Sequence, residues 1–156
     1  MPDVFTKAKR SHVMSRIRGH GNKDTELALI RFFRLHGITG WRRRQTIFGK
    51  PDFIFPKLKL AIFVDGCFWH GCPLHATKPI NNADFWQIKF AANKARDLLV
   101  TRTLSSAGWS VIRIWEHELV RKNEKRLRLR LLRHFKKNGV YGDKAPPLKN
   151  YIINRS

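Results

Sequence analysis

Apolar residues recur along the chain with two kinds of spacing, and the spacing predicts which segments are helices and which are strands. Leu27, Ile30 and Phe33 lie three residues apart, which predicts a helix over 24–37 that ends at a glycine. Short aromatic and β-branched runs then predict three strands, over 41–48, 52–55 and 60–64. Because Gly and Pro separate these runs, we interpret them as an antiparallel meander.

A long helix is predicted next, beginning after Asn81 or Asn82 and stopping at Gly108. Its expected buried stripe steps by three and four residues and consists of Phe85, Ile88, Ala92, Ala95 and Leu99. The apolar run over 109–115 predicts a fourth strand.

The last predicted helix begins near Asn123, ends at Gly139 and buries Leu127, Leu131 and Phe135. The element order is therefore α-β-β-β-α-β-α, in which the long helix allows a parallel crossover between the third and fourth strands. This order predicts a mixed α/β sheet flanked by helices. We expect a single domain over 1–156, with a basic arm over about 1–23 and an irregular tail over about 140–156.

The net charge of the chain indicates which class of molecule the protein binds. The chain has 32 Lys and Arg against 11 Asp and Glu, a net charge of +21, while 42% of its residues are hydrophobic. That apolar content excludes a disordered basic tail, and the charge on a folded domain favours a polyanion, with nucleic acid first. Because no apolar run is long enough to span a bilayer and no signal peptide is evident, we expect a cytoplasmic protein without membrane contact.

Two cysteines and two histidines have spacings suited to a metal. Cys67, Cys72 and His75 are close in sequence, and His117 follows the fourth predicted strand. Two thiolates and two imidazoles favour tetrahedral Zn²⁺ in a structural site. The alternative is that the cysteines are ordinary buried thiols and the histidines are surface residues.

Carboxylates form a second candidate site. Asp52 begins one predicted strand and Asp65 ends the next, so adjacent strands place both at one end of the sheet. With the carbonyl of Val64 they would offer hard oxygen ligands for Mg²⁺ beside a scissile phosphate, and Glu26 could join them. Taken singly, each acid also has an ordinary explanation as a turn or helix-capping residue.

His70 lies between the two cysteines and is a candidate general base, because an imidazole titrates near neutral pH. Asp97, on the long helix, could orient it. The alternatives are a further metal ligand or an exposed histidine for His70, and an ordinary surface ion pair for Asp97.

Phe68 and Trp69 are adjacent in a loop flanked by glycines, and Trp86 begins the long helix. Aromatic side chains near a phosphate site can wedge between base pairs and unstack them. The alternative is that these rings pack around the metal loop.

These residues resemble the very-short-patch-repair (Vsr) mismatch endonucleases over about residues 7–137. The resemblance rests on the segments Met14–Arg18, Asp24–Glu26, Pro51–Phe53, Phe63–Pro73, Phe85–Trp86, Arg96–Asp97 and Gly108–Glu116. It implies a restriction-endonuclease-like fold, a structural zinc and a Mg²⁺-dependent nick 5′ of the mispaired thymine in a T:G mismatch.

The resemblance also implies roles for single residues. Asp52 would be the central metal ligand, His70 the base and Glu26 a catalytic acid. The aromatic wedge would comprise Phe68, Trp69 and Trp86, and further DNA contacts would come from Met14, Arg16 and Arg18.

The sequence departs from the family pattern in one respect. Nucleases of this fold commonly carry a lysine two residues after the second acid, but Cys67 stands there, so His70 must act as the base. Related proteins can carry histidine in place of Asp65, which leaves open whether Asp65 binds the metal.

We therefore predict a mismatch-specific nicking endonuclease that acts on double-stranded DNA as a monomer, since a nick needs one active site. Mismatch-repair proteins and a cytosine methyltransferase system are partners implied by the resemblance alone. The alternatives are a restriction nuclease of the same fold that cuts paired DNA, and a non-catalytic DNA-binding module held together by zinc.

Overall fold

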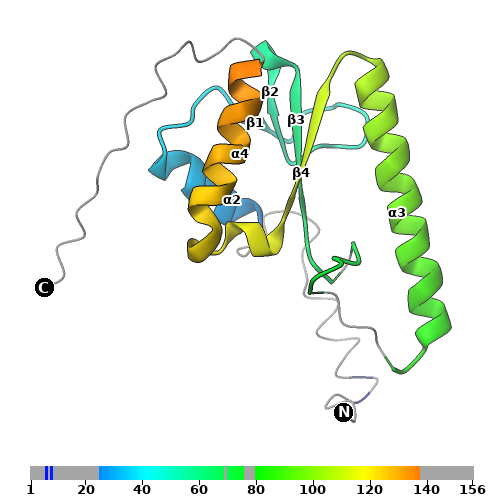
Figure 1. Ribbon diagram of the computed structural model, residues 1–156. Helices are drawn as coiled ribbons and strands as arrows, with labels where there is room; N and C mark the ends of the chain where they lie inside the picture. The colour runs from blue at the N-terminus through cyan, green and yellow to red at the C-terminus, as the bar shows by residue number, and fades with distance from the viewer. Residues whose placement is uncertain (1–5, 7, 9–24, 69, 76–79, 138–156) are drawn as a thin grey trace, which may run out of the picture.

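The computed structural model describes residues 6, 8, 25–68, 70–75 and 80–137. Within them, a four-stranded sheet of order β1-β2-β3-β4 lies between helices (Figure 1). The strands are β1 (Arg42–Arg43), β2 (Phe53–Phe55), β3 (Leu60–Asp65) and β4 (Ser110–Trp115). The helices are α2 (Glu26–Leu35), α3 (Ala83–Ser106) and α4 (Glu124–Lys137), with short 3-10 turns at Pro56–Leu58, Glu116–Leu119 and Arg121–Asn123.

The strand pairing confirms the predicted mixed sheet. β1, β2 and β3 pair antiparallel, and β4 pairs parallel to β3, in register from Leu60 opposite Ser110 to Asp65 opposite Trp115. The helix α3 makes the crossover between β3 and β4, as the sequence predicted. It follows that β3 and β4 end, and β2 begins, at the same end of the sheet. The candidate functional residues gather at this end.

The two faces of the sheet bury different helices. Alternate residues of β3 and β4, such as Leu60, Ile62 and Ile114, pack against α2 and α4. Their neighbours in sequence, such as Ala61 and Phe63, pack against α3. In Figure 1, α2 and α4 accordingly lie on one side of the sheet and α3 on the other.

The first predicted strand is much shorter than expected. The run over 41–48 contributes only Arg42–Arg43 to the sheet. Arg44 has a φ of 53°, in the left-handed region, which turns the chain out of the strand direction. The aromatic and β-branched residues beyond it belong to a loop.

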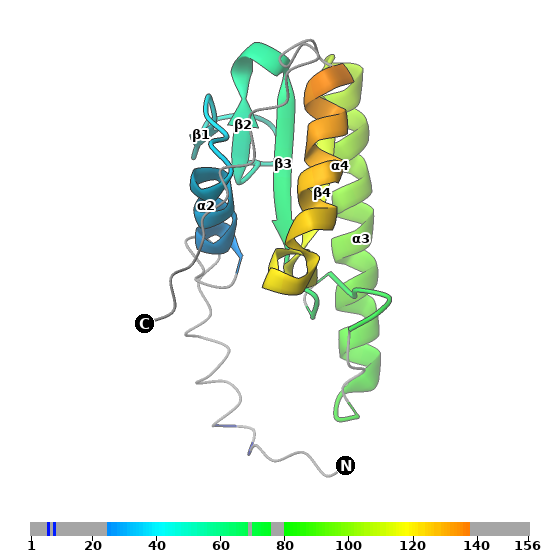
Figure 2. The ribbon, with the colours of Figure 1, turned by 60° about the vertical axis from the view of Figure 1, so that its left-hand side comes forward.

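The predicted buried stripe of the long helix is wrong. Phe85, Ile88 and Leu99 are 57%, 71% and 58% exposed, whereas Trp86, Val100 and Leu104 are buried. A helix of 24 residues is about 36 Å long and a strand of six residues about 20 Å, so α3 overhangs the sheet. Both views show its N-terminal half extending past the end of β3 (Figures 1 and 2), so that only the C-terminal half, through Val100 and Leu104, packs on the sheet. Trp86 is buried instead against Phe68 of the loop after β3.

The last helix follows the prediction more closely. It begins at Glu124, one residue after the expected start, and buries Leu127, Leu131 and Phe135. Among the described residues, no helix has the length and apolar character needed to cross a bilayer.

Two leucines on α3 test which face of this helix is buried. Leu104→Ala removes a side chain that is 2% exposed and should lower the free energy of unfolding by about 2–5 kcal/mol. Leu99→Ala is the matched control on the solvent side and should change it by less than about 0.5 kcal/mol. Urea denaturation measures both, and a larger loss for Leu99→Ala would restore the original prediction.

Candidate active site and metal centre

Three acids from three elements converge where β2 begins and β3 ends, and we call Glu26, Asp52 and Asp65 the acid cluster. Asp52 stands just before β2, and its Oδ2 accepts a hydrogen bond of 2.7 Å from the Val64 N–H. Burial raises the pKa of Asp52 to about 7, against the lowering effect of that hydrogen bond. The negative charge of Glu26, a hydrogen bond to it and the charge of Asp65 raise this pKa further.

Glu26 reaches the acid cluster from the first turn of α2. It is buried and forms an ion pair with Arg43 of β1, whose guanidinium also lies over the ring of Phe53. The sequence predicted that Glu26 could join the strand-end acids, and the structure brings it there.

His70 lies between two carboxylates. Its Nδ1 is 2.7 Å from Oδ2 of Asp97, and its Nε2 is 3.8 Å from Oδ1 of Asp65. When Nδ1 carries the proton that Asp97 accepts, Nε2 keeps a lone pair on the side of the acid cluster. Asp97 is thus placed as the sequence suggested. It lies 27 residues after His70, on α3, and contacts the imidazole directly.

Arg113 is the residue that the sequence analysis missed. It lies in the middle of β4, and its Nη1 is 3.1 Å from both carboxylate oxygens of Asp65 and 3.4 Å from Oδ1 of Asp97. The pKa of Asp65 is raised by burial, against the lowering effects of His70 and of Arg113. A cation in the apolar run Val-Ile-Arg-Ile-Trp was the available signal, because a buried strand rarely holds an unpaired charge.

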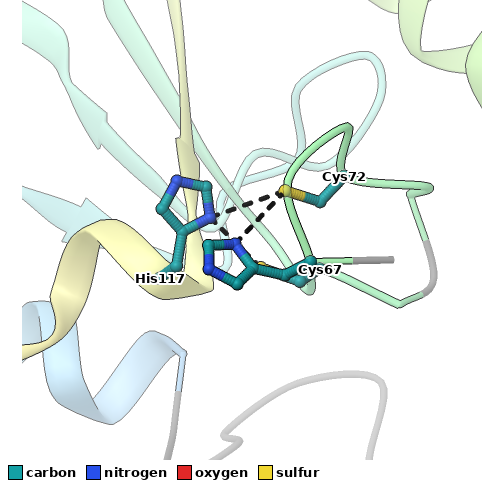
Figure 3. A group of neighbouring side chains, drawn as sticks. Cys67, Cys72 and His117 are labelled. Carbon is teal, nitrogen blue, oxygen red and sulfur yellow. Dashed lines mark hydrogen bonds between the residues drawn. The ribbon is translucent and has the colours of Figure 1, made fainter. Parts of the chain in front are cut away.

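The predicted metal ligands Cys67, Cys72, His75 and His117 form a Cys/His cluster. Cys67 and Cys72 come from the loop after β3, and His117 comes from the turn after β4; Figure 3 shows these three pointing toward one another. The four ligand atoms lie within 4.8 Å of one another. The group could therefore hold a metal ion, and it joins the ends of two adjacent strands.

The distances within the Cys/His cluster fit a tetrahedral ion. Nδ1 of His117 lies 3.3 Å from Sγ of Cys67 and 3.5 Å from Sγ of Cys72, and Nδ1 of His75 lies 3.9 Å from Cys72. Zinc–sulfur and zinc–nitrogen bond lengths give a sulfur-to-nitrogen edge of about 3.6 Å in a tetrahedral site. One imidazole nitrogen has a single lone pair and accepts one S–H, so two thiols around it favour a shared central ion.

Burial and the neighbouring Cys72 raise the pKa of the Cys67 thiol, with Glu116 also raising it and a hydrogen bond with His117 lowering it. The Glu116 carboxylate accepts a hydrogen bond of 3.2 Å from the Cys67 N–H, which ties the loop to the end of β4. Two thiolates at this place need a cation to stabilise them.

The aromatic residues are only partly arranged as predicted. Phe68 packs edge-on against Trp86, with ring centroids 5.2 Å apart, and against Phe90. Trp86 is 9% exposed, and the neighbouring Phe85 carries the exposed ring instead. Trp69 and the predicted DNA contacts Met14, Arg16 and Arg18 lie outside the described residues.

Comparison with known proteins supplies the family. The model of the DNA mismatch endonuclease Vsr family matches residues 2–75. The type II nicking enzyme V.NaeI of Lentzea aerocolonigenes is 39% identical over 119 residues, which are 71% of this chain and 69% of that protein.

Two further relatives extend the match. The type II nicking enzyme V.NmeAIP of Neisseria meningitidis is 37% identical over 138 residues, covering 87% of this chain and 98% of its own. The DNA mismatch endonuclease Vsr of Escherichia coli K12 is 34% identical over 119 residues, covering 74% of each chain. The family resemblance drawn from the sequence motifs is confirmed, and the chain belongs to the Vsr family of DNA mismatch endonucleases.

Proposed function

We propose that this protein is a Mg²⁺-dependent endonuclease of restriction-endonuclease-like fold that nicks double-stranded DNA on the 5′ side of the mispaired thymine in a T:G mismatch. The observation that carries the proposal is the position of His70. Its Nδ1 is held by Asp97 and its Nε2 faces the acid cluster, an arrangement that suits activation of water beside a phosphate. Membership of the Vsr family supports the DNA substrate and the reaction class.

The acid cluster fits a divalent cation. The raised pKa of Asp52 reports negative charge that its surroundings leave poorly compensated, and a bound cation would favour the ionised form. Asp52, Asp65 and the Val64 carbonyl would hold Mg²⁺, with Glu26 next to them. The ion would polarise the scissile phosphate and stabilise its developing charge.

The chain's own groups handle the proton. His70 takes a proton from the attacking water at Nε2, while its Nδ1–H remains bonded to Asp97. Asp97 thereby fixes the ring orientation and tautomer and stabilises the imidazolium that forms. No lysine is needed in this role.

The Cys/His cluster would hold Zn²⁺ as a structural ion. His70 lies in the loop between Cys67 and Cys72, so an ion bound there would set the position of the base relative to the acid cluster. The free energy of zinc binding would then contribute to folding of this loop.

The aromatic residues would provide mismatch recognition. Phe68 and Trp86, whose rings pack edge to face, would act together with Trp69 and enter the base stack next to the mispair, where unstacking costs least. Surplus positive charge would supply contacts to the phosphate backbone that do not depend on sequence.

Strand-resolved nicking tests the proposed reaction. With Mg²⁺, the protein should cut only the thymine strand of a labelled T:G duplex and leave the matched C:G duplex intact. Asp52→Asn should bind the T:G duplex within about threefold of the wild-type affinity and lose at least about 10³-fold in nicking rate, because it removes a ligand charge. Equal cutting of the matched duplex would indicate a restriction nuclease.

Metal removal tests the Cys/His cluster. We expect plasma mass spectrometry of the purified protein to find one zinc per chain. Cys72→Ser should lose this zinc, and its free energy of unfolding should fall by more than about 2 kcal/mol. Chelation of the wild type should produce the same loss, and added Zn²⁺ should reverse it. A wild-type protein that contains no zinc and is unaffected by a chelator would contradict the assignment.

The raised pKa of Asp52 predicts the pH dependence of stability in Mg²⁺-free buffer. A group whose pKa is about 7 in the folded chain and 3.8 in the unfolded chain stabilises the fold below pH 4, and this contribution is lost as the pH rises through 7. Urea denaturation between pH 5 and 8, without chelator so that zinc is retained, should show falling stability. Asp52→Asn should show a smaller fall, and Mg²⁺ should reduce it in the wild type alone.

A further inference from the structure

Arg113 is a cation that makes several contacts beside the candidate active site. It lies in β4, a strand otherwise made of apolar or uncharged residues, and its side chain is 22% exposed. Its guanidinium lies over the ring of Phe63, 4.5 Å from the centroid, on the adjacent parallel strand. A charge in this position needs several partners to offset its desolvation.

Those partners are the two carboxylates on either side of His70. Nη1 donates to both oxygens of Asp65 at 3.1 Å and lies 3.4 Å from Oδ1 of Asp97. Nη2 donates to the main-chain carbonyl of Asp97 at 3.2 Å, and Nε donates to the Thr101 hydroxyl at 3.5 Å. One planar group therefore joins the end of β3 to the middle of α3.

This junction determines where the imidazole of His70 can lie. Asp97 holds Nδ1 at 2.7 Å, and Asp65 faces Nε2 at 3.8 Å, so the two contacts of the ring come from the two acids that Arg113 fixes. Asp65 and Asp97 come from different elements, and α3 overhangs the sheet beyond this point. Without a bridging cation, the two like charges would repel each other across the ring.

We propose that Arg113 is a positioning residue of the nicking reaction, which fixes Asp65 and Asp97 and through them the base His70. The inference rests on the proposed function. The nitrogens of the Arg113 guanidinium donate to protein groups, namely the Asp65 carboxylate, the Asp97 carbonyl and the Thr101 hydroxyl. A carboxylate has about four lone-pair sites, so Asp65 retains acceptor capacity after Arg113 is bound.

The geometry requires arginine rather than any cation. The contacts come from Nη1, Nη2 and Nε of one plane and reach two side chains and a carbonyl. A lysine ammonium is a single point donor and cannot span these acceptors at once. Arg113→Lys should therefore keep the positive charge and lose part of the alignment of Asp65, Asp97 and His70.

The matched control is Arg130 of α4. It also forms a close pair with one carboxylate, Glu118, and its Nη2 donates to the Arg113 main-chain carbonyl. Within the described part of the chain, it forms no ion pair with Asp65 or Asp97 and no hydrogen bond with His70. Arg130→Met thus breaks a comparable ion pair, between α4 and the turn after β4, without removing a contact of the imidazole. It separates loss of stability from loss of alignment.

The experiment measures single-turnover nicking of a T:G duplex at saturating enzyme, together with the dissociation constant for the duplex and the melting temperature. Arg113→Met should lower the rate constant about 100-fold, since misplacing a catalytic group by about 1 Å costs that much, and change the dissociation constant less than threefold. Arg113→Lys should be about tenfold slower than wild type. Arg130→Met should lower the melting temperature and keep the rate within threefold of wild type.

The outcomes are distinct. A rate constant for Arg113→Met within threefold of that for Arg130→Met overturns the inference. A wild-type nicking rate for Arg113→Lys also overturns it, and this variant provides the test if Arg113→Met does not fold. Equal losses of rate in Arg113→Met and Arg130→Met, in proportion to their melting temperatures, indicate a structural role only. A wild-type protein that nicks no T:G duplex refutes the proposed function instead, before any variant is compared.

Discussion

The burial of negative charge at one end of a small sheet is the constraint on which the rest of the site depends. Glu26 and Asp65 are buried and Asp52 is largely so, and such groups remain charged in a protein interior only when cations are close. Arg43 forms an ion pair with Glu26, and Arg113 forms one with Asp65. Among the described residues, no arginine forms an ion pair with Asp52, and burial raises the pKa of this acid to about 7.

The second constraint is the loop between Cys67 and Cys72, because it carries His70 beside that charge. Hydrogen bonds from the His70 and Cys72 N–H groups to Gly66 and Cys67 carbonyls fold this loop on itself. Glu116 holds it from β4, and a metal in the Cys/His cluster would close it. A base on a short loop could otherwise drift, and a general base must stay within hydrogen-bond reach of its proton. The fold of this loop therefore places His70 beside the acid cluster.

Much of this could be predicted from the sequence, and the exceptions share a cause. Local spacing predicted the element order, and the clustering of chemically distinctive residues between Val64 and His75 supplied three of the four residues of the Cys/His cluster. The spacing of Phe85, Ile88 and Leu99 was misleading, because helical periodicity says which residues share a face and not which face meets the sheet. Arg113 was missed because its role depends on the register of β4 against β3, a tertiary property that no local pattern specifies.

Acidic residues are scarce in this chain, and their scarcity affects the net charge of the protein as well as the candidate site. Most acids among the described residues are engaged in contacts within the protein. Glu118 pairs with Arg130 and Glu124 with His36, while Glu26, Asp65 and Asp97 pair with Arg43, Arg113 and His70 respectively. The chain as a whole has 32 Lys and Arg against 11 Asp and Glu, a net charge of +21. Such a field attracts the phosphate backbone from a distance and weakens with salt, independently of base sequence. Under the proposed function, this attraction would bring any duplex to the protein, and the aromatic groups at the site would discriminate between duplexes.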